Sequence, residues 1–219
     1  MQLPRRRPPR RVAKNSKASR KGPKRRGVPH LGAPDSGQGI ALVVGLGNPG
    51  RRYRFTRHNM GRMAAEAIIE KSEVLARGKW PEGNLTLLFS SGKRFLVLAP
   101  ETFMNLSGRA VVQVLEAYGI GADRMLVIHD DIDLGLGDIR VKQGGGTGGH
   151  RGLASLVEVL QGSGFRRLRM GVGRPPEGID AAEYVLSVFP EEESEKARQE
   201  IAGAVEAALG EVTGADGVA

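Results

Sequence analysis

The sequence contains no cysteine among its 219 residues, and this absence removes several kinds of chemistry. Disulfides, thiolate nucleophiles, cysteine-ligated zinc and iron–sulfur clusters are all excluded. Long hydrophobic runs are missing too, since runs such as 41–44 and 95–99 fall far short of the ~18 residues of a membrane helix. We therefore expect no membrane partner, and the lack of an apolar signal segment favours a cytoplasmic location.

Positive charge is concentrated at one end of the chain. The sequence has 33 Lys and Arg against 24 Asp and Glu, a formal net charge of +9. Residues 1–38 hold 12 of the basic residues and one acid, Asp35, which leaves residues 39–219 with 21 basic and 23 acidic residues, a net charge of −2. Because 1–38 is rich in Pro, Arg and Lys and poor in apolar residues, we expect a disordered basic extension. An RNA-binding arm, an organelle transit peptide and an adventitious extension all fit it, and we rest no function on it.

Apolar periodicity over 39–219 predicts one domain of alternating strands and helices. Helical spacing begins near Met60 and recurs after Pro190, and Asn105 is placed to N-cap another helix. Strands are predicted at 40–44, 85–89, 95–99, 125–128, 139–142 and 168–172. The second and third of these form a hairpin that turns at 90–93. This alternation predicts a single-domain α/β/α sandwich around a central mixed, mostly parallel, twisted sheet.

Polar clusters follow three of the predicted strands. Asn48 and His58 lie on the connection after the first strand, the segment 102–105 follows another, and 129–133 follows a third. Open α/β sheets bind ligands beyond the carboxyl ends of their strands. The pattern therefore predicts a site with a histidine, an aspartate and two carboxamides.

Several familiar motifs would indicate other functions, but each lacks the structural context that its function requires or is absent. Residues 45–50 match G-x-G-x-x-G, yet helical spacing starts only near Met60, too late for a dinucleotide site. Clustered aspartates at 130, 131 and 133 could bind Mg²⁺, although such clusters more often form turns. His-x-His, HExxH and Gly-x-Ser-x-Gly are absent. We therefore expect no metal and no cofactor. We also expect His129 to point away from the cleft or to be a satisfied strand-end residue, and His150 to cap a helix.

Glycines and basic residues supply further candidates. The segment 144–152 is a flexible connector, a mobile gate or a backbone surface that approaches a phosphate or sugar. Arg151 sits in the first turn of the next helix, where a cation opposes the helix dipole, so it is a candidate ligand contact. Two pairs share strand faces and could hold phosphates: Arg140 with Lys142, and Arg167 with Arg169.

Taken together, these motifs resemble the bacterial-type peptidyl-tRNA hydrolase family. The matching stretches occur in the family's order and cover roughly residues 40–212: 43–50, Tyr53, 56–59, 102–108, 129–133, 144–152 and 165–173. The resemblance implies an esterase that cuts the bond between a peptide's carboxyl group and the 3′ ribose of tRNA. Such an enzyme recycles tRNA from prematurely released peptidyl-tRNA, acts as a monomer and requires no metal or cofactor.

The resemblance also implies roles for individual residues. His58 would be the general base that activates water, with Asp130 orienting its ring and Asn48 bonding the substrate near the scissile carbonyl. The substrate-binding residues would be Asn105 on the peptide backbone, Tyr53 and Phe103 along the path of the 3′ end, and Lys142 and Arg169 at the 5′ phosphate.

One position departs from the family pattern. Arg151 stands where the family commonly has Asn, and a guanidinium cannot accept a hydrogen bond as an amide does. Arg151 could bind terminal phosphates instead. An alternative function on the same fold is that of an RNA-binding splicing cofactor without catalysis, but retention of Asn48, His58, Asn105 and Asp130 favours the enzyme.

Overall fold

The computed structural model describes residues 31–36 and 39–214. Its strands are β1 (Leu42–Gly45), β2 (Glu73–Trp80), β3 (Gly83–Ser90), β4 (Lys93–Pro100), β5 (Met125–Asp131), β6 (Ile139–Gln143) and β7 (Arg166–Gly171). Its α-helices are α1 (Met60–Lys71), α2 (Ser107–Tyr118), α3 (Arg151–Leu160), α4 (Ala181–Val185) and α5 (Glu191–Thr213). Short 3-10 helices are η1 (Arg51–Tyr53), η2 (Arg57–Asn59), η3 (Met104–Leu106) and η4 (Ala122–Arg124).

The strands form one mixed sheet in the order β2-β3-β4-β1-β5-β7-β6. The four neighbouring strands β4, β1, β5 and β7 are parallel, whereas β3 and β6 run against their neighbours. The carboxyl ends of the four parallel strands therefore meet at one edge of the sheet. The predicted mixed, mostly parallel sheet is confirmed.

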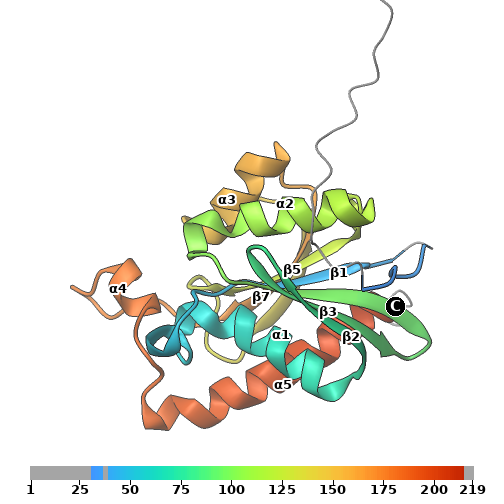
Figure 1. The fold of residues 1–219 in the computed structure, drawn as a ribbon. Helices are drawn as coiled ribbons and strands as arrows, with labels where there is room; N and C mark the ends of the chain where they lie inside the picture. Colours follow the sequence, from blue (N-terminus) through green and yellow to red (C-terminus); the bar gives the residue numbers. More distant parts are fainter. Residues whose placement is uncertain (1–30, 37–38, 215–219) are drawn as a thin grey trace, which may run out of the picture.

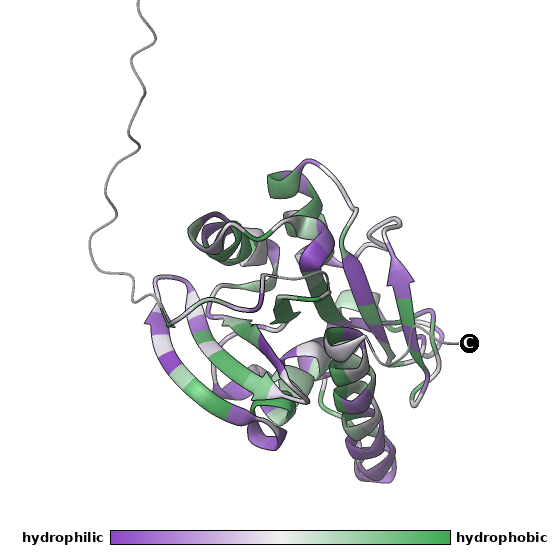
Figure 2. Cartoon of the chain, turned by 90° about the vertical axis from the view of Figure 1, so that its right-hand side faces the viewer, coloured by the Kyte–Doolittle hydropathy of each residue, from purple (hydrophilic) through white to green (hydrophobic). Residues whose placement is uncertain are grey.

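Helices cover both faces of this sheet, as Figure 1 shows, with α2 and α3 on one side and α1 and α5 on the other. Alternate strand residues face opposite layers: Leu42 and Val44 pack with α2 and α3, and Val43 packs with α1 and α5. Green strands fill the centre of Figure 2, with purple toward the periphery. The α/β/α sandwich is thus built from strands that are apolar on both faces.

The structure corrects several expected elements. Asn105 caps no helix: it lies within η3, and α2 begins two residues later with Leu106 at its N-cap position. β7 starts at Arg166, before the predicted 168. The sequence patterns did not indicate β2, whose residues are largely exposed at the sheet edge, or α4, which has no buried residue to produce a periodic pattern.

The predicted boundary between extension and domain also differs. Residues 31–36 pack against the domain, because the side chain of Asp35 accepts hydrogen bonds from the backbone and guanidinium of Arg94, at 2.9 and 3.1 Å. Leu31 joins one of the two core layers and its amide donates to the Tyr118 hydroxyl. The rest of the predicted extension, 1–30 and 37–38, lies outside the described residues. No helix among the described residues is long and apolar enough to cross a membrane.

Candidate active site

A close helix–strand contact brings the two central side chains of the site together. At Gly61, in the first turn of α1, a Cβ atom would lie 2.1 Å from the carbonyl oxygen of Ile128 in β5. Only glycine permits this approach. It sets η2, which carries His58, against the end of β5, which carries Asp130.

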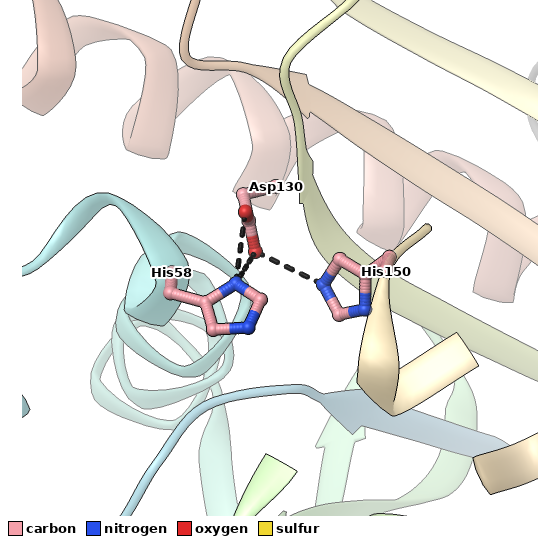
Figure 3. Close-up of side chains that lie close together, drawn as sticks. All are labelled: His58, Asp130 and His150. Atoms are coloured by element: carbon pink, nitrogen blue, oxygen red, sulfur yellow. Dashed lines mark hydrogen bonds and ion pairs between the residues drawn. The ribbon is translucent and has the colours of Figure 1, made fainter. Parts of the chain in front are cut away.

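Two histidines share the carboxylate of Asp130, as Figure 3 shows. Nδ1 of His58 lies 3.0 Å from both carboxylate oxygens of Asp130, and Nε2 of His150 lies 3.1 Å from Oδ1. All three residues are mostly removed from solvent, with His58 8% and Asp130 3% exposed. The predicted His58–Asp130 pair is present in the structure, but its second partner, His150, was not foreseen.

The hydrogen bonds of His150 determine which nitrogens carry protons. Its Nδ1 accepts from the amides of Gly152 and Leu153 at 3.1 and 3.2 Å, which confirms the predicted cap on α3. Nδ1 is therefore unprotonated, and Nε2 carries the hydrogen donated to Asp130. Since the ionised Asp130 only accepts, His58 Nδ1 donates as well. The remaining nitrogen of His58, Nε2, faces away from Asp130 (Figure 3) with a free lone pair.

The electrostatics support this protonation pattern. Burial opposes ionisation of Asp130, but the adjacent imidazoles of His58 and His150 outweigh it and lower the pKa of the carboxyl group. Asp130 therefore stays ionised and can stabilise an imidazolium. Burial, helped by His150, lowers the pKa of His129 to about 3, so His129 stays neutral.

Hydrogen bonds to the side chain of Asn59 and the backbone of Met104 fix the position of Asn48. The backbone N–H of Asn48 donates to Oδ1 of Asn59 at 2.8 Å, and Nδ2 of Asn59 donates to the backbone carbonyl oxygen of Asn48 at 3.0 Å. Its own Oδ1 accepts from the amide of Met104 at 2.8 Å. That bond fixes the orientation of the carboxamide, so Nδ2 of Asn48 remains as a donor. The predicted meeting of the clusters after β1 and β4 is confirmed.

A pocket of about 330 Å³ opens beside the two histidines. Its lining includes His58, Asp130, His150 and Arg151, together with residues 180–182 and Val185, at and within α4. Arg151 is exposed and is the first residue of α3, as predicted. The α4 wall is a part of the site that the sequence did not reveal.

A second pocket, of about 190 Å³, shares His129 and Asp131 with the first and is lined by Lys142 and Arg169. These two basic residues come from neighbouring antiparallel strands, in which Lys142 pairs with Arg167 and Arg140 with Arg169. Arg169 donates to Oδ2 of Asp131 at 2.7 Å. Arg167 also lines this pocket, but it is only 3% exposed and donates to the carbonyls of Gly145 and Gly146, so it is a weaker candidate for a phosphate contact than Lys142 or Arg169.

Arg167 also contacts the glycine segment. Its two bonds hold Gly145 and Gly146 in place, and Gly144, Gly145, Gly148 and Gly149 all adopt positive φ. The segment therefore forms part of both pockets, which include Gly148, as expected for a backbone surface that approaches a ligand, and its use as a connector or a gate stays a prediction. The expectation that His129 points away from the cleft is wrong: it is buried, lines both pockets, and its Nδ1 lies 2.7 Å from the carbonyl oxygen of Asp130.

The other predicted binding residues lie outside the linings of these two pockets. Phe103 is 54% exposed and precedes Met104, the residue bonded to Asn48. Asn105 is exposed in η3, and Tyr53 is partly buried at the end of η1. All three belong to segments that border Asn48.

The three side chains His58, Asp130 and His150 offer atoms within 4.8 Å of one another, close enough to consider a metal ion. Their hydrogen bonds argue against this use. Both imidazoles direct N–H groups at Asp130. For Nε2 of His150 to bind a metal, the proton would have to move to Nδ1, where it would face the two amide N–H groups that donate to Nδ1 at the start of α3. The arrangement instead suits general base chemistry.

Comparisons with known proteins agree with this geometry. The sequence model of a family described as Peptidyl-tRNA hydrolase matches residues 42–217. A peptidyl-tRNA hydrolase from Trichlorobacter lovleyi is 45% identical over 166 residues, 75% of this chain and 85% of the relative. One from Rickettsia felis is 44% identical over 164 residues, 74% and 88% of the two chains. A crystal structure of peptidyl-tRNA hydrolase from Acinetobacter baumannii superposes with a TM-score of 0.75 at 36% identity, covering 80% of this chain and 89% of that one. The chain belongs to the peptidyl-tRNA hydrolase family.

Proposed function

We propose that the chain hydrolyses the ester between a peptide's terminal carboxyl group and the 3′ ribose of tRNA, with water as the nucleophile. One observation carries this proposal: His58 is held by ionised Asp130 through Nδ1, which leaves Nε2 as a free base. General base catalysis by such a histidine is worth about 10²–10⁴-fold. No serine or cysteine nucleophile is required.

The reaction can be written with the residues present. Nε2 of His58 removes a proton from water as the oxygen attacks the ester carbonyl, and Asp130 stabilises the imidazolium that forms. The carbonyl oxygen becomes an oxyanion, toward which Nδ2 of Asn48 donates a hydrogen bond. The C–O bond to the ribose then breaks, and the imidazolium returns its proton to the 3′ oxygen. The products are tRNA with a 3′ hydroxyl and the peptide carboxylic acid, which releases its remaining proton to water.

His150 has a positioning role in this scheme. Because its cap on α3 fixes its ring, its N–H always donates to Oδ1 of Asp130. The carboxylate is thereby prevented from turning away from His58. Asp130 is held from two sides, which keeps the base oriented before the substrate arrives.

The second pocket suits a phosphate of the tRNA. Lys142 is exposed, and Arg169 keeps most of its donors while Nε bonds to Asp131. Phosphate contacts of this kind give affinity without reading sequence, as suits an enzyme for many tRNAs. Asn105, Tyr53 and Phe103 would contact the peptide and the 3′ end, and Arg151 a terminal phosphate. We further propose that the protein acts as a monomer in the cytoplasm.

The test is release of a labelled N-acetyl-aminoacyl group from tRNA by wild type and by His58→Ala. We expect the variant to lose at least about 10²-fold in kcat while its thermal unfolding and tRNA affinity stay close to wild type. Gly164→Ala is a matched control, since a Cβ there has no atom within 4 Å. If wild type binds tRNA but releases nothing, the non-catalytic RNA cofactor is the better assignment.

A further inference from the structure

Arginine and aromatic residues gather on the outer part of the β1–α1 connection. Arg51, Arg52 and Arg54 are exposed, Tyr53 is partly buried, and Phe55 is 61% exposed. We call residues 51–55 the arginine–aromatic loop. It lies on the same connection as Asn48 and His58, two residues of the site, and joins the segments that carry them.

The charges of this loop are not neutralised by the fold. Among residues 31–36 and 39–214, the three loop arginines form no ion pair with a carboxylate, whereas buried Arg57 pairs with Glu193 and Arg169 with Asp131. Arg52 lies 4.4 Å from the Tyr53 ring centroid and donates to its hydroxyl, and Arg54 lies 5.3 Å from the Phe55 ring. Three full positive charges on four successive residues thus face solvent, which suits a polyanion.

Two exposed phenylalanines distinguish this surface from an ordinary basic patch. Phe55 and Phe103 are 61% and 54% exposed, and they lie on the two segments that the bond from Met104 to Asn48 joins. Neither contributes to the buried core clusters. Exposed aromatic faces beside arginines are the usual means of binding unpaired nucleotides, since each stacked base contributes about 1–3 kcal/mol.

We infer that the arginine–aromatic loop binds the unpaired 3′-terminal nucleotides of the tRNA, with Arg51, Arg52 and Arg54 on backbone phosphates and Phe55 stacked on a base. This inference rests on the proposed function. Stacking on these aromatic rings requires unpaired, splayed bases, and a duplex does not offer them. The paired stem would instead bind at the second pocket, where Lys142 and Arg169 present cations without exposed aromatic rings.

The experiment compares the triple variant R51Q/R52Q/R54Q with wild type on two substrates that carry the same N-acetyl-aminoacyl group. One is tRNA, and the other is the 3′ ester of adenosine alone, which has no backbone phosphate. We expect KM for the tRNA substrate to rise at least about 10-fold, with kcat within about twofold and the adenosine ester unaffected. Losing three single-strand phosphate contacts should also reduce the slope of log KM against log salt by about 2.

A matched control separates a local contact from net charge. The variant R77Q/K79Q/K93Q removes the same charge from β2 and the β3–β4 hairpin, at the far edge of the sheet. It should leave KM for tRNA within about twofold. Phe55→Ser should raise KM about fivefold or more while keeping the salt slope, because stacking is not a charge contact.

Binding of a labelled, deacylated single-stranded oligonucleotide with the tRNA 3′ sequence measures the contact independently of catalysis. Weaker binding by the loop variants supports the inference even if wild type releases no product, a result that would refute the proposed function alone. Equal losses on tRNA and adenosine ester, or equal effects of the loop and control triples, would overturn the inference. So would unchanged oligonucleotide binding.

Discussion

Replacing Glu200 by Gln should remove a pH dependence from the stability of the fold. Glu200 lies in α5, is 3% exposed, and its Oε2 accepts from the amide of Gly137 at 2.8 Å. Its other oxygen, Oε1, has no partner among the described residues. Burial raises the pKa of this carboxyl group from 4.5 to about 7, against the opposing effect of the Gly137 and Gly171 amides.

The sign and size of the effect follow from this shift. Between pH 4.5 and about 7 the native state holds a proton that the unfolded chain has released. The contribution of Glu200 is therefore fully present below pH 4.5 and is lost as the pH rises through about 7. At about 1.4 kcal/mol per pKa unit, the shift corresponds to a loss of about 3 kcal/mol, an upper limit that relaxation around the charge would reduce to about 1–3 kcal/mol.

Urea unfolding from pH 5 to 8.5 provides the assay. Wild type should lose about 1–3 kcal/mol more than Glu200→Gln over this range, because glutamine keeps the acceptor for Gly137 and has no proton to release. Glu206→Gln, an exposed position in the same helix, is the control and should keep the wild-type pH dependence. The reasoning would be refuted if Glu200→Gln showed the same pH slope as wild type.

Three further predictions concern the site and its supports. Asp130→Asn should lower kcat about 10²–10⁴-fold in the release assay, since an amide cannot stabilise the His58 imidazolium; a loss below tenfold contradicts the role. Arg57 bonds Ser187, Val188 and the partly exposed Glu193 and stacks on Tyr184 of α4, so Arg57→Ala should destabilise the fold by about 1–3 kcal/mol and increase hydrogen exchange across 180–189; unchanged exchange there contradicts a role in holding α4. Gly61→Ala would place a Cβ 2.1 Å from the Ile128 carbonyl, so kcat and melting temperature should both fall, whereas Gly164→Ala should change neither.

Some features of this protein follow from local sequence alone. The buried strands, the hairpin and the helix after Met60 were predicted because burial imposes a period of two or an apolar run on strands and a period of 3.6 on helices. The placing of Asn48, His58 and Asp130 near one sheet edge also followed, since parallel strands bring their carboxyl ends together. The family was evident from the order of these motifs.

Tertiary structure alone decided how the polar side chains are used. His150 reaches Asp130 across 20 residues, a pairing that depends on how β6 and the glycine segment return to the site. Arg167 and Arg169 lie two residues apart on one strand and both line the second pocket, yet Arg167 donates to backbone carbonyls whereas Arg169 donates to the Asp131 carboxylate. Periodicity reports which face a residue occupies, but hydrogen-bond partners depend on the relative position of distant segments, which packing of the whole domain sets.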